Sequence, residues 1–78
     1  MMPGDYTPRQ GQYLAFIQHY TRVHRYPPAE SDIRIGVTAP SVHLMIVKLT
    51  EREFIERIPY TLRSIRVLLP PDQLPVLE

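Results

Sequence analysis

The chain contains 78 residues, enough for one small domain and no more. It has no cysteine, so disulfide bonds and thiolate metal ligands are excluded. The net charge is only +1, but all nine basic residues lie between Arg9 and Arg66, and nine basic against five acidic residues give that segment +4. No apolar run approaches membrane-spanning length and no secretory signal opens the chain, so we expect a cytoplasmic protein.

A first helix is predicted from about Pro8 to about His24. Thr7 is a suitable N-cap, Pro8 fits the first helical position, and Gln10 stands where a capping box has Glu or Gln. Apolar residues then recur at helical spacing. They are Tyr13, Leu14, Phe16, Ile17, Tyr20 and Val23. The two prolines after Tyr26 end this helix, because a residue before proline disfavours the helical conformation.

A second, short helix is predicted from about Ala29 to Ile35, with Ile33 as its buried residue. Glu30 and Asp32 lie in its first turn, where acidic side chains suit the helix dipole. Gly36 follows as a left-handed helix terminus.

A third helix is predicted to open at Thr38 and to continue to about Arg52. Proline in its first turn is compatible with a helix start. Its core face is apolar at helical spacing and consists of Val42, Met45, Ile46 and Leu49. Leu44 projects nearly opposite Val42 on the helical wheel, and Val47 lies near Leu44, so both point away from the core face.

Two short strands are predicted, at 54–58 and 64–69, with a turn at 59–63. Alternation of apolar and polar residues in the second run is typical of a half-buried strand. The predicted core combines residues from both helical faces and the hairpin: Phe16, Ile17, Val42, Met45, Leu49, Ile55, Ile65 and Val67. The expected fold class is α+β, mostly α: three helices plus a two-stranded hairpin, in the order of a winged helix-turn-helix. We expect a flexible tail at 1–6, the domain at 7–69 and a proline-rich tail at 70–78.

Five segments, in this order, resemble one known family. They are Tyr6-Thr7-Pro8-Arg9-Gln10, Pro27-Pro28, Pro40-Ser41-Val42-His43, Phe54-Ile55-Glu56-Arg57 and Arg63 to Leu69. Together they make the chain similar to the DNA-binding domain of LexA-type repressors, and more closely to short stand-alone LexA-like and MarR-like regulators. The resemblance implies a winged helix that binds operator DNA through the third helix and the wing. The peptidase portion of LexA-type repressors has no counterpart among these residues, so autoproteolysis is not expected.

The sequence departs from the LexA pattern at three places. The span from Pro28 to Pro40 is about two residues shorter, so the second helix is expected to lose roughly half a turn. Glu53 stands where the family usually has glycine, between the third helix and the next strand. Tyr60 follows Pro59 where relatives often have Pro-Gly.

The candidate DNA contacts come from the third helix and the hairpin. On the helix they flank or oppose the core face: Ser41, His43, Leu44, Val47 and Lys48. On the hairpin they are Arg57, Arg63 and Arg66, expected to bind phosphate or to enter the minor groove. Alternatives remain open for both groups. The helix face could simply be solvated, His43 could cap or pack locally, and Arg57 could pair with a glutamate.

The function expected from these residues is regulation of transcription by binding double-stranded DNA, as a homodimer on a two-fold-related site. The alternative is a winged-helix protein-protein interaction module, favoured by the apolar outer face of the third helix and by the apolar tail residues Leu74, Val76 and Leu77. We expect no enzymatic activity, because Ser41 and His43 lie too close along one helix to act as nucleophile and base. No cofactor, metal, membrane or small-molecule substrate is expected.

Overall fold

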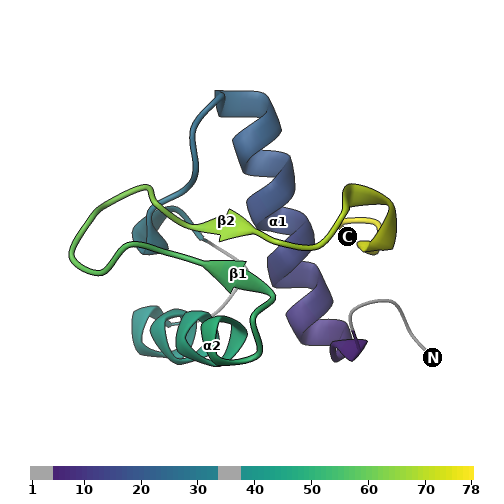
Figure 1. Ribbon diagram of the computed structural model, residues 1–78, viewed down its shortest axis with the longest axis horizontal. Coiled ribbons are helices and arrows are strands. Elements are labelled where there is room, and N and C mark those ends of the chain that lie inside the picture. The colour runs from purple at the N-terminus through teal and green to yellow at the C-terminus, as the bar shows by residue number, and fades with distance from the viewer. Residues whose placement is uncertain (1–4, 34–37) are drawn as a thin grey trace.

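The computed structural model describes residues 5–33 and 38–78, and it is a mostly helical α+β globule (Figure 1). Within these two ranges the structure contains two α-helices, two 3-10 turns and a two-stranded antiparallel hairpin. Their bounds are α1 (Pro8–His24), η2 (Glu30–Asp32), α2 (Ala39–Glu51), β1 (Ile55–Glu56), β2 (Arg66–Val67) and η3 (Pro71–Gln73). The arrangement is consistent with the predicted winged helix.

Helix α1 confirms the predicted first helix, from about Pro8 to about His24. The Gln10 amide donates to the Thr7 side chain while the Gln10 side chain accepts from the Thr7 amide, so that two free helix N–H groups are satisfied reciprocally. The helix ends at Arg25, whose φ of 67° is left-handed and whose amide donates to the Thr21 carbonyl. Local signals in the sequence therefore determine both ends of α1.

The prediction of a second α-helix from Ala29 to Ile35 is wrong for the described residues. A single 3-10 turn, η2, stands there, and Ile33 already has an extended backbone with φ −83° and ψ 102°. The Asp32 carboxylate accepts from the Ala29 amide at 2.9 Å and caps the start of this single turn. Ile33 is buried as predicted. Ile35 and Gly36 lie outside the described residues.

Helix α2 confirms the third predicted helix, with Thr38 as its N-cap. It stops in a Schellman motif: the Phe54 amide donates to the Leu49 carbonyl and the Glu53 amide donates to the Thr50 carbonyl, both at 3.0 Å. Glu53 itself is left-handed, with φ 61°. A glutamate here has the left-handed conformation that glycine most often adopts at a helix C-terminus.

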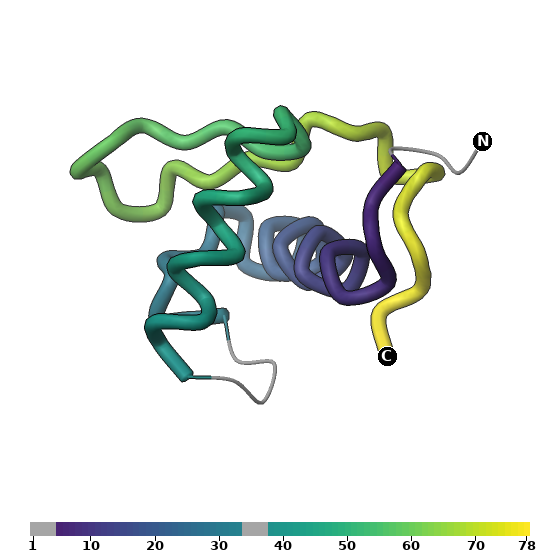
Figure 2. The backbone as a smooth tube through the Cα atoms, turned by 90° about the horizontal axis from the view of Figure 1, so that it is seen from below, coloured from purple at the N-terminus to yellow at the C-terminus, as the bar shows by residue number. Residues whose placement is uncertain are grey.

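The hairpin is shorter than predicted. The Leu68 amide donates to the Phe54 carbonyl at 2.9 Å, but only residues 55–56 and 66–67 form strands, with Ile55 opposite Val67. Beyond this pair the Ser64 hydroxyl lies 2.9 Å from the Ile58 amide, which donates to it, and 3.2 Å from the Ile58 carbonyl. A side chain thus takes the place of the partner strand, and the left-handed Tyr60, with φ 62°, turns the chain. The loop projects at the opposite end of the molecule from the C-terminal segment (Figures 1 and 2).

The core lies where α1 meets β2 and where α2 meets β1 and η2. Of the predicted core, five residues are buried: Ile17, Val42, Leu49, Ile55 and Ile65. Three others, namely Phe16, Met45 and Val67, are only partly buried and pack on its edge, which corrects the prediction that they would be buried with the rest. The most deeply buried positions of the two helices also include Tyr13, Leu14 and Ile46.

Residues near both ends of the chain pack on α1. The Tyr6 ring contacts the core and its hydroxyl donates to the Gln73 carbonyl. The Gln12 side chain donates to the Val76 carbonyl at 3.0 Å and accepts from the Glu78 amide at 2.9 Å. The C-terminal residues therefore form an extended strap along the helix. Across the ranges that the structure describes, no helix is long and apolar enough to cross a membrane.

Candidate nucleic-acid interface

The outward face of α2 holds the helix residues singled out from the sequence. Ser41, His43, Leu44 and Lys48 are exposed, whereas Val47 is half-buried. Leu44 has 61% of its surface exposed, which matches the outward direction that the helical wheel gives it. This face offers a hydroxyl, an imidazole, an ammonium group and an apolar pair to a partner.

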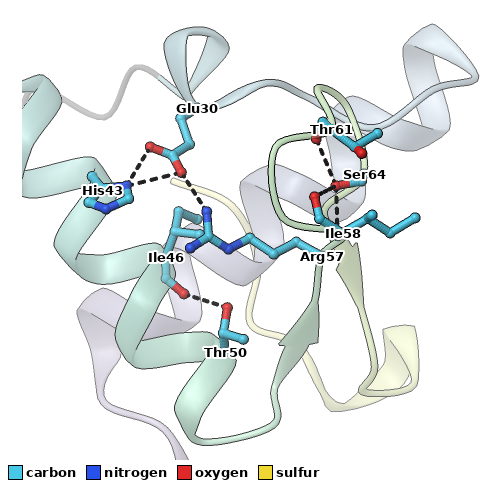
Figure 3. Close-up of polar contacts among 8 residues, drawn as sticks. All are labelled: Glu30, His43, Ile46, Thr50, Arg57, Ile58, Thr61 and Ser64. Carbon is cyan, nitrogen blue, oxygen red and sulfur yellow. Dashed lines mark hydrogen bonds and ion pairs between the residues drawn. The ribbon is translucent and has the colours of Figure 1, made fainter.

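Glu30 of η2 lies between α2 and the hairpin and joins them through its carboxylate (Figure 3). Its two oxygens lie 3.0 and 3.2 Å from Nδ1 of His43, and Oε2 accepts from the Arg57 guanidinium at 3.1 Å. The side chains of Glu30 and Arg57 are 33% and 29% exposed, so solvent screens their attraction only in part. One acidic residue thus holds two of the candidate DNA contacts.

Arg63 points back from the hairpin loop onto the body of the domain. Its guanidinium donates to the Asp32 carboxylate at 3.0 Å and lies 4.7 Å from the centre of the Tyr26 ring. The pKa of the Asp32 carboxyl lies below its ordinary value, first because it accepts the Ala29 amide and then because Arg63 attracts its negative charge. The Tyr20 hydroxyl beside Arg63 and the charge of Asp32 raise the pKa of the guanidinium. Arg63 therefore fixes the loop to η2 and α1.

Arg66 pairs across the hairpin with Glu56, its direct partner in the strand register. Both side chains are largely exposed, and such pairs contribute only about 0–1 kcal/mol to stability. All three hairpin arginines therefore have a carboxylate partner within the domain.

The end of the hairpin is apolar. Ile58, Tyr60 and Leu62 are 63%, 108% and 82% exposed. An open hollow of about 410 Å³ lies between this loop and η2, and its lining includes Ile58, Leu62 and Ile65. The outward chemistry of the hairpin end is thus hydrophobic, while Arg57 and Arg63 pair with the acids of η2.

The sequence leaves open whether Arg57 pairs with a glutamate, and the structure shows that it does, with Glu30. The sequence predicts that Glu30 and Asp32 suit a helix dipole, whereas in the structure Glu30 pairs with His43 and Arg57 and Asp32 pairs with Arg63. Two acids opposite a cluster of arginines in a short chain were the available signal. Which cation each acid would meet depends on tertiary packing, which no local pattern encodes.

The described ranges contain no cluster of three or more His, Asp or Glu side chains that could hold a metal ion. The His43 imidazole pairs with a carboxylate, but Ser41 lies two residues away on the same helix and its hydroxyl bonds instead with that of Thr38, at 3.0 Å. Nothing in this arrangement places a nucleophile against a base.

Comparison with known proteins gives one relative of note. No protein-family model matches the chain. It is 30% identical over 71 residues to the LexA repressor of Bartonella quintana (strain Toulouse), a match that covers 87% of this chain. The chain spans about 30% of the length of that repressor. The resemblance predicted from the five sequence segments is thereby confirmed: over most of its length, this chain is similar to a LexA repressor.

Proposed function

We propose that this chain is a DNA-binding domain of a transcriptional regulator, which reads double-stranded DNA with α2 and contacts the backbone with the hairpin. The observation that carries the proposal is the similarity to a LexA repressor over 87% of the chain. The fold supports it, because a turn, a capped helix with an exposed face and a hairpin follow in the order of a winged helix-turn-helix.

The proposed DNA contacts fall into two groups: side chains of α2 that are accessible to solvent, and side chains that pair with a carboxylate. Ser41, Leu44 and Lys48 are exposed on α2 and are proposed to meet the major groove, with Lys48 on phosphate. Val47 is half-buried beside them and adds apolar contact with a thymine methyl group. His43 and the three hairpin arginines are proposed to contribute through side chains that also have carboxylate partners.

Selection from random duplex DNA tests this proposal, followed by titration of the enriched sequence. Leu44→Ala should weaken binding at particular A·T positions, because a lost apolar contact with a thymine methyl costs discrimination there. Val23→Ala is the matched control, since Val23 is similarly exposed, at 59%, but lies on α1. No enriched motif, with equally weak binding of all duplexes, would contradict the proposal.

A second candidate function is a protein-protein interaction module built on the same fold. The exposed apolar loop of Ile58, Tyr60 and Leu62, together with outward Leu44, favours it, because apolar anchors of this kind dominate protein interfaces. Leu44→Asp should then abolish self-association or partner binding, as measured by sedimentation. Unchanged sedimentation, together with lost sequence-dependent DNA binding, would exclude this candidate.

Homodimer formation is proposed with the regulator function, on the grounds of small size and of paired half-sites in operators. Sedimentation of the protein with a duplex carrying one or two copies of the selected motif measures it. We expect two protein chains to bind cooperatively to each duplex that carries two copies of the motif.

A further inference from the structure

The Glu30 carboxylate occupies donors that a DNA phosphate would need. Arg57 and His43 come from different elements, and both turn toward this one side chain (Figure 3). Guanidinium groups bind carboxylates and phosphates through the same forked N–H geometry, so the two anions compete for Arg57. A fixed carboxylate in the same domain has the advantage of high local concentration.

Glu30 also places a negative charge between the two elements proposed to contact DNA. A phosphate approaching Arg57 meets the repulsion of this carboxylate, and the pair as a whole is neutral. The contribution of Arg57 to counterion release, which drives most of the affinity for duplex DNA, is therefore reduced. Lys48 differs, because it is exposed and pairs with no carboxylate in the described part of the chain.

We propose that Glu30 is a positioning residue that holds Arg57 and His43 against η2 and thereby limits the strength and the salt dependence of DNA binding. This inference rests on the proposed function. In this proposal η2 does more than connect the two helices, because Glu30 determines how many cations the interface presents to DNA.

The test is titration of a duplex at several salt concentrations with the intact chain and with Glu30→Gln, which removes the charge and keeps the shape. If Arg57 is released, the slope of log affinity against log salt should steepen by about 0.9. If the parent and the variant bind equally at 1 M salt, this difference in slope corresponds to about eightfold tighter binding by the variant at roughly 0.1 M. The double variant Glu30→Gln with Arg57→Gln should lose the gain in slope.

Glu51→Gln is the charge-matched control. Glu51 is exposed at the end of α2 and forms no ion pair with the residues that the structure describes. Its neutralisation changes the general field of the domain without releasing a cation. Equal slopes for the Glu30 and Glu51 variants would overturn the inference while leaving DNA binding by the parent chain intact.

A second measurement keeps the inference testable if Glu30→Gln does not fold. In the parent chain Arg57→Gln should change the salt slope by less than half a unit, whereas Lys48→Gln should reduce it by about one. Equal losses for the two variants would overturn the inference. A parent chain that binds no duplex even at low salt would instead overturn the proposed function, and this inference with it.

Discussion

Replacement of Glu53 by glycine is expected to stabilise the domain. Glu53 has φ 61° at the end of α2, where its amide and that of Phe54 close the Schellman motif. The left-handed conformation costs a side-chain-bearing residue roughly 1–2 kcal/mol. Glycine avoids this strain, but its extra freedom in the unfolded chain opposes the gain by about 0.4–1 kcal/mol.

The net expected gain in the free energy of unfolding is about 0.8 kcal/mol, the difference between the midpoints of these two ranges. For a domain of this size it corresponds to an increase in melting temperature of roughly 2–8 °C. Urea denaturation and thermal melting both measure it. Glu53→Ala is the control, because it removes the same carboxylate and retains a Cβ in the left-handed conformation. Equal stability of the alanine and glycine variants, or a glycine variant weaker than the parent, would refute the argument from backbone strain.

Three other perturbations test the core, the acid in η2 and the packing of α1. Leu49→Ala should lower the free energy of unfolding by about 2–5 kcal/mol, because Leu49 is fully buried. The same change at exposed Leu44 should alter it by no more than about 0.5 kcal/mol. Similar melting temperatures of the two variants would show that the buried face of α2 is misassigned. Asp32 has a folded-state pKa below its ordinary value of 3.8, so its stabilising contribution is fully present above about pH 4 and is lost as the pH falls through the lower folded-state value. Asp32→Asn should remove this part of the acid dependence in melting curves, and an unchanged pH profile would contradict it. Gly11→Ala should not stabilise α1, although alanine has the higher helix propensity. The alanine Cβ would lie 2.7 Å from a ring carbon of Tyr6, which is too close. A higher melting temperature of this variant would show that the Tyr6 ring moves away freely.

The helices were predictable because their signals are local. Thr7 and Gln10 form the expected capping box, and Thr38 caps α2 at the expected position. Prolines and caps act within a turn of the residues that carry them, so the sequence alone indicates these boundaries. The outward direction of Leu44 followed in the same way, from helical periodicity.

The second helix and the hairpin were less predictable because tertiary and side-chain contacts decide them. Asp32 bonds its own turn and the distant Arg63, so the segment ends as a 3-10 turn where helix propensity alone would extend it. Ser64 replaces strand pairing with bonds to Ile58, and this shortens the hairpin below the length that apolar alternation indicates. The partners of the candidate site depend on the same contacts, so the sequence left open whether Arg57 pairs with a glutamate, and only the packing of η2 identifies Glu30 as that partner.

The placement of charge, more than its total, bears on what this domain can bind. The segment from Arg9 to Arg66 carries +4, yet each arginine of the hairpin faces a carboxylate. Attraction to phosphate falls steeply with salt, because each protein cation that neutralises a phosphate releases a counterion from the DNA. A hairpin with internally paired cations and an apolar end gives little of that attraction, so in the proposed regulator the contacts of α2 with the bases would supply a larger share of specific binding. The affinity of the proposed regulator for duplex DNA should then depend weakly on salt and strongly on the operator sequence. A module that docks on another protein would show no dependence of DNA binding on the DNA sequence.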